Sequence, residues 1–102
     1  MTDRVEIPLG EIPTGEMKRV EIAGEGVCVA NLGGGKLCAV SDTCTHALAS
    51  LSEGILEGDE VICPLHGAMF DLRDGKVTCG PATSDLRSYP VRVEGEMIIV
   101  DA

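Results

Sequence analysis

The chain contains 102 residues and carries a net charge of −9, because eight Lys and Arg stand against 17 Asp and Glu. This length predicts a single domain spanning residues 1–102, since domains usually contain about 100 to 200 residues. The excess of acids repels nucleic-acid phosphates and anionic lipid surfaces, and no segment approaches the roughly 20 apolar residues of a membrane span. The N-terminal sequence shows no secretion signal. We therefore expect a soluble cytoplasmic protein that binds neither nucleic acid nor membranes.

Turn signals recur at short intervals along the chain and separate segments of high strand propensity. The predicted strands cover, in chain order, residues 5–9, 17–22, 27–31, 36–41, 60–63, 69–72, 76–78, 89–93 and 97–100. No segment has the 3.6-residue period of a helix. This pattern predicts an antiparallel, all-β domain.

Cysteine and histidine form two mixed pairs near the middle of the chain. Cys44-Thr45-His46 is followed, after a gap of 16 residues, by Cys63-Pro64-Leu65-His66, and the pairs include both histidines of the chain. Five cysteines in a chain without a secretion signal favour metal ligation over a disulfide framework. Two thiolates and two imidazoles suit either zinc or an iron-sulfur cluster. Zinc fingers usually keep their two Cys together and their two His together, so the mixed order favours a [2Fe-2S] cluster and leaves a zinc-stabilised β interaction module as an alternative.

These residues, with Gly67, form a C-x-H and C-x₂-H-G pattern that resembles the signature of Rieske [2Fe-2S] proteins, above all the small ferredoxins of bacterial ring-hydroxylating dioxygenase systems. The segments 70–75 and 79–82 extend the resemblance. It implies a Rieske-type antiparallel sandwich or barrel, with a small cluster-binding subdomain over about residues 43–82 and a base subdomain from the remainder. It also implies that Cys44 and Cys63 hold the inner iron, while His46 and His66 hold the outer iron near the surface.

The same resemblance implies a one-electron carrier in aromatic compound degradation. Electrons would come from an NAD(P)H-dependent flavoprotein reductase and go to a terminal Rieske oxygenase, through transient docking of a monomer. We do not expect an enzyme, because no histidine remains for a mononuclear iron and 102 residues leave no room for a nucleotide-binding domain. The alternative within electron transfer is a Rieske-like small subunit of another oxidoreductase, such as a nitrite reductase.

Two departures from the respiratory branch of the family predict a low redox potential. The positions of its loop disulfide correspond to Ala49 and Leu65, and the positions of its serine and tyrosine hydroxyls correspond to Ala68 and Phe70. Hydrogen bonds to sulfur favour the more negative, reduced state, so their absence lowers the potential. The three cysteines outside the ligand set are expected to be packing residues: Cys28, Cys38 and Cys79.

Acidic residues gather around the predicted cluster. The segment from residue 37 to residue 72 contains no Lys or Arg and holds six acids: Asp42, Glu53, Glu57, Asp59, Glu60 and Asp71. Such a stretch is often an ordinary solvated face. Beside an electron-transfer centre it also predicts electrostatic attraction of basic partners, with the uncharged residues Ala47, Leu48, Pro64 and Leu65 making the close contact.

Overall fold

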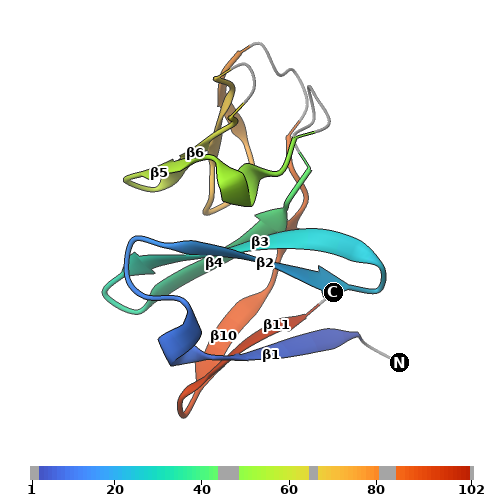
Figure 1. Cartoon of the computed structure of the whole chain (residues 1–102), viewed down its shortest axis with the longest axis vertical. Helices are drawn as coiled ribbons and strands as arrows, with labels where there is room; N and C mark the ends of the chain where they lie inside the picture. Colours follow the sequence, from blue (N-terminus) through green and yellow to red (C-terminus); the bar gives the residue numbers. More distant parts are fainter. Residues whose placement is uncertain (1–2, 44–48, 65–66, 81–84, 102) are drawn as a thin grey trace.

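The computed structural model describes residues 3–43, 49–64, 67–80 and 85–101, which form three antiparallel sheets (Figure 1). The first sheet contains, in spatial order, β1 (Arg4–Pro8), β11 (Met97–Asp101) and β10 (Val91–Glu94). The second contains β2 (Met17–Ile22), β3 (Glu25–Gly33), β4 (Lys36–Ser41) and β9 (Ser88–Tyr89). The third contains β5 (Ile55–Glu57), β6 (Glu60–Ile62), β7 (Met69–Asp71) and β8 (Val77–Cys79). The prediction of an antiparallel, all-β fold is confirmed.

The helical content of the described residues is limited to two short 3₁₀ helices, η1 (Leu9–Glu11) and η2 (Leu51–Glu53). Neither is long or apolar enough to span a bilayer, and no other helix in the described ranges could do so.

The second sheet is the middle layer of the molecule, and both of its faces are covered (Figure 1). Side chains alternate between faces along a strand, so in β3 Cys28 and Ala30 pack toward the third sheet, while Val27 and Val29 pack toward the first. All four are fully buried. Burial on both faces explains why this strand is a continuous apolar run rather than an alternating one.

Most predicted strands are found within one or two residues of their expected bounds. The segment predicted as one strand over residues 89–93 is instead two strands, because Pro90 has no N–H to continue a ladder. Before it, β9 pairs with β4; after it, β10 pairs with β11. The chain thus passes from the second sheet to the first at this proline. The strand β5 was not predicted, since it has three residues and only Leu56 packs toward the core.

Candidate metal centre

Cys63 is the one predicted ligand that lies among the described residues; Cys44, His46 and His66 lie outside them. Its side chain is buried, and its thiol forms no disulfide. It belongs to a core cluster between the second and third sheets. No set of three metal-ligating side chains comes together within the described ranges, so the complete ligand set stays a prediction.

The chain around Cys63 turns tightly where β6 ends and β7 begins. The Cys63 amide donates to the Ala68 carbonyl at 2.7 Å, and the Gly67 amide donates to the Cys63 carbonyl at 3.2 Å. Gly67 has φ of +76°, a backbone conformation that glycine adopts without the clash of a Cβ. These two bonds hold Cys63 next to Gly67 and the buried Ala68, which are described residues on either side of His66.

The described residues just before and just after the segment with Cys44 and His46 also lie next to each other. Thr43 and Ser50 form an antiparallel bridge, and Asp42, one residue earlier, is buried with 2% of its surface exposed. The Asp42 carbonyl accepts from the Leu51 amide at 2.7 Å, and its Oδ1 accepts from the Ser52 amide at 2.8 Å. Asp42 therefore joins the end of β4 to η2 across the predicted ligand segment.

An arginine compensates the charge of this buried carboxylate. Arg19 of β2 places Nε 3.3 Å from Asp42 Oδ2, although its own side chain is 48% exposed. Gly26 leaves the space for it: a Cβ at this position would lie 2.8 Å from Arg19 Nη2. We name the arrangement of Arg19, Gly26 and Asp42 the Asp42 anchor.

Breaking the Asp42 anchor is expected to destabilise the chain next to the predicted ligands. Arg19→Ala leaves a buried carboxylate without its counter-charge, and the cost should be about 1–3 kcal/mol, below that of a fully buried pair because Arg19 is half exposed. Gly26→Ala should cost less, because its Cβ would meet the flexible end of the Arg19 side chain, which can move aside. Lys18→Ala is the matched control, since its pair with Glu11 is exposed on both sides and should contribute less than about 1 kcal/mol. Urea unfolding measures the three values, and equal values for Arg19→Ala and Lys18→Ala would contradict the role of the anchor.

Hydrogen bonds next to the turn after β7 join the described residues that precede and follow residues 81–84. The Leu86 amide donates to the Gly75 carbonyl at 2.7 Å, and Asp85 Oδ1 accepts from the Val77 amide at 3.0 Å. Gly75 has φ of +80°, and a Cβ there would lie 2.2 Å from the Leu86 carbonyl oxygen, so only glycine allows this approach. Residues 79–80 follow this closure in the chain, and residues 81–82 lie outside the described residues.

One core cluster joins the ends of all three segments. Ala49 follows residues 44–48, Cys63 and Ala68 stand on either side of residues 65–66, and Leu86 follows residues 81–84; all four contribute to the same cluster, which also contains Leu51. Packing therefore brings together described residues that border the predicted ligand segments.

Burial separates the remaining cysteines into three environments. Cys28 is fully buried, as predicted, and burial, followed by the charge of Asp42, raises the pKa of its thiol to about 12. Cys28 is therefore a neutral thiol that packs in the core. Cys38 is half-buried against the core cluster. Cys79 is exposed at the end of β8, so the prediction that it is a packing residue is wrong: it lies on the face of the third sheet that points away from the core.

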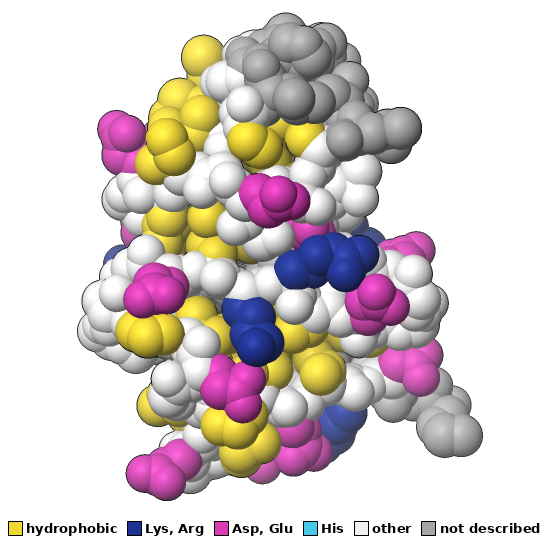
Figure 2. All heavy atoms as spheres, viewed as in Figure 1, with side chains coloured by type: hydrophobic (Ala, Val, Ile, Leu, Met, Phe, Trp, Pro, Cys, Tyr) yellow, Lys and Arg dark blue, Asp and Glu magenta, His cyan; other side chains and the backbone are white. Residues whose placement is uncertain are grey.

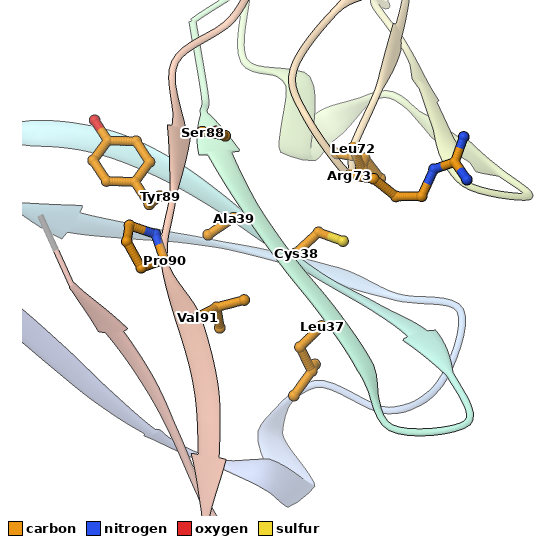
Figure 3. A pocket seen from close by; sticks show the side chains of 9 residues that line it. All are labelled: Leu37, Cys38, Ala39, Leu72, Arg73, Ser88, Tyr89, Pro90 and Val91. Carbon is orange, nitrogen blue, oxygen red and sulfur yellow. The ribbon is translucent and has the colours of Figure 1, made fainter.

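Cys38 also lines a cavity of about 310 Å³ between the second sheet and the turn after β7. Figure 3 shows its thiol directed toward Leu72 and Arg73, while the Arg73 guanidinium points away from the cavity. That guanidinium pairs with Asp71 at 2.7 Å and Asp59 at 3.7 Å. Burial raises the pKa of Cys38, which favours its neutral thiol.

The acids predicted to surround the cluster are partly neutralised. Asp42 is buried against Arg19, and Asp59 and Asp71 pair with Arg73, whose hydrogen bond lowers the pKa of Asp71. The other three acids, Glu53, Glu57 and Glu60, form no ion pair with the described residues. The six acids are therefore not equivalent, because Arg19 and Arg73 reach this segment from outside it.

Comparison with known proteins identifies the family of this chain. Residues 5–90 match the Rieske [2Fe-2S] domain family. The 3-phenylpropionate/cinnamic acid dioxygenase ferredoxin subunit of Escherichia coli (strain K12) is 44% identical over 95 residues, which are 92% of this chain and 88% of that protein.

Solved structures agree with the sequence comparison. The ferredoxin of carbazole 1,9a-dioxygenase from Nocardioides aromaticivorans superimposes with a TM-score of 0.91 at 32% identity, covering 98% of this chain and 97% of that one. A ferredoxin solved in a complex of reduced oxygenase and oxidized ferredoxin in carbazole 1,9a-dioxygenase gives a TM-score of 0.89 at 33% identity, covering 95% and 91%. This chain belongs to the Rieske [2Fe-2S] family.

Proposed function

We propose that this chain is a one-electron carrier: it accepts an electron from an NAD(P)H-dependent flavoprotein reductase and passes it to the terminal oxygenase of an aromatic-ring-hydroxylating dioxygenase system. The observation that carries this proposal is the match to dioxygenase ferredoxin components over nearly the full length of both chains. A carrier needs a redox centre and a docking surface, not a substrate pocket. We further propose that it works in the cytoplasm as a monomer that docks transiently.

Family membership implies a Rieske-type [2Fe-2S] cluster, which supplies reversible one-electron redox chemistry when bound. We propose Cys44, His46, Cys63 and His66 as its four ligands, and the described residues fit this set. Cys63 offers an unpaired thiol, buried among apolar side chains at the tight turn before β7. The other two cysteines of this core, Cys28 and Cys38, lie outside the two Cys/His pairs.

The two kinds of ligand have different tasks in this proposal. A buried cysteine holds its iron away from water, as the 2% exposure of Cys63 allows. A histidine bound through one ring nitrogen leaves the other nitrogen free for a partner or a proton. The histidine side is therefore the proposed exit for the electron. We also propose that residues 43–82 act as a cluster-binding subdomain supported by the rest of the chain, because the third sheet lies within this range.

Two alternative functions have less support from the related proteins. A zinc-stabilised module disagrees with membership of an iron-sulfur family. A small subunit of a nitrite reductase shares the fold, but the relatives at 32% to 44% identity are dioxygenase ferredoxins.

A reconstituted electron-transfer chain tests the proposed function. The purified holoprotein should be red-brown, contain two irons per chain, and couple oxidation of NAD(P)H by a flavoprotein reductase to turnover of a terminal ring-hydroxylating oxygenase. Omitting the carrier is the control. If the reductase reduces the holoprotein but the oxygenase does not reoxidise it, the proposed place in a dioxygenase system is wrong.

The redox potential is expected near the low end of the Rieske range, at roughly −150 mV. Ala68 and Phe70 are both fully buried in the same core cluster as Cys63, and neither has a hydroxyl to donate to sulfur. Phe70→Tyr introduces a buried hydroxyl and should raise the potential, while Phe70→Leu, which adds none, is the control. A redox titration at neutral pH measures all three, and a clearly positive value for the unmodified protein would contradict the prediction.

A further inference from the structure

Four apolar side chains form a line across the outer face of the third sheet. Register pairs Ile55 with Ile62, Ile62 with Met69, and Met69 with Cys79. Their strand neighbours Leu56, Val61 and Phe70 pack into the core on the opposite face. Alternation therefore directs Ile55, Ile62 and Met69 away from the core, and Cys79 joins them because register pairs it with Met69 across the β-bulge between the Met69 and Phe70 pairs. We name these four side chains the apolar row.

The apolar row is open to solvent at both ends. Ile55, on the edge strand β5, is 63% exposed, and Cys79 at the other end is also exposed. Hydrophobic side chains are visible over the part of the molecule where Figure 1 places β5 and β6 (Figure 2). Exposed apolar side chains that continue across several strands are typical of interaction surfaces.

An acidic row runs parallel to the apolar row on the same face. Glu57 pairs in register with Glu60, and Glu60 with Asp71. Like charges directly opposite each other in a sheet are destabilising, and among the described residues neither Glu57 nor Glu60 has a Lys or Arg partner. A basic surface brought against this face would relieve that repulsion.

The two rows differ in their distance from the proposed cluster. Ile62 directly precedes Cys63, Met69 directly follows Ala68, and Cys79 directly precedes Gly80. The apolar row therefore lies at the ends of β6, β7 and β8 that meet the proposed ligand segments. The acidic row lies at the opposite ends of these strands, next to the β5–β6 turn.

We infer that this face is a docking surface for the terminal oxygenase, which would contact the apolar row with apolar side chains and the acidic row with Lys and Arg. The inference rests on the proposed function. It adds that the oxygenase contacts the outer face of the third sheet in addition to the histidine side of the cluster. Because the second sheet covers the other face of the third, the surface is one-sided, so the partner has to approach in one orientation. A ferredoxin of this fold is known in complex with its oxygenase, which shows that such a partner exists for a relative.

Ile55→Glu tests the docking surface, with Val93→Glu as the matched control. Both residues are exposed large hydrophobics, at 63% and 41%, but Val93 lies on β10 of the first sheet. Both variants should retain the native visible spectrum and two irons per chain. We expect Ile55→Glu to raise the dissociation constant for the terminal oxygenase at least tenfold and Val93→Glu to change it less than twofold, as measured by binding of the oxidised holoprotein.

The outcomes distinguish this inference from the proposed function. Equal affinities for both variants and the unmodified protein, with normal oxygenase turnover, overturn the docking surface and leave the carrier role intact. Weaker binding of Ile55→Glu to the reductase alone also overturns it, because the surface would then belong to the electron donor. If the unmodified holoprotein does not bind the oxygenase at all, the proposed function fails together with the inference.

Discussion

Replacing Cys63 by alanine is expected to abolish the Rieske-type spectrum and to leave fewer than two irons per chain. The variant loses one of only four proposed protein bonds to the cluster, and the other cysteines of the core, Cys28 and Cys38, lie on β3 and β4, outside the two Cys/His pairs. The same loss is expected for alanine at Cys44, His46 or His66. Visible and electron paramagnetic resonance spectra, together with iron analysis, measure the effect.

Cys38→Ala is the control for this experiment. It also removes a thiol that packs against the core cluster, but it should retain both irons and the native spectrum. A full complement of iron with an unchanged spectrum in any one of the four alanine variants would falsify the assignment of that residue as a ligand.

Electron transfer from the reductase is expected to slow about tenfold as ionic strength rises from 0.01 M to 0.5 M, because screening shortens the range of steering attraction. The acids expected to carry this attraction are Glu53, Glu57 and Glu60, which form no ion pairs with the described residues. Changing these three to glutamine should reduce both the rate at low salt and its salt dependence. Stopped-flow reduction of the holoprotein across a salt series measures both.

A second triple variant separates local steering from net charge. Glu6, Glu16 and Glu96 are exposed and lie outside the third sheet, so changing them to glutamine alters the net charge by the same amount in another place. This control should keep most of the salt dependence. A rate that does not vary with salt, or equal losses in the two triple variants, would show that the acids beside the cluster do not steer the encounter.

Much of this architecture can be predicted from local signals. The turns at Gly33–Gly35 and Asp74–Gly75 and the apolar run from Val27 to Ala30 identify strands without any tertiary information, because glycine-rich turns and strand propensity act over a few residues. The two Cys/His pairs limit the expected cofactor to zinc or an iron-sulfur cluster for a similar reason. Their mixed order favours the two-iron cluster, and the resemblance of the motif to Rieske proteins decides between the two.

Other features depend on contacts between residues far apart in the chain. The pairing of Arg19 with Asp42 joins residues 23 positions apart, and Arg73 compensates both Asp71 of β7 and Asp59 of the β5–β6 turn, so the charge of a segment does not predict its surface potential. The exposure of Cys79 and the apolar row follow from strand register, which places residues from four strands in one line. Composition and spacing therefore identify the chemistry of this protein, whereas only the tertiary structure decides which charges are neutralised and which face is open to a partner, because both depend on distances between strands that sequence separation does not encode.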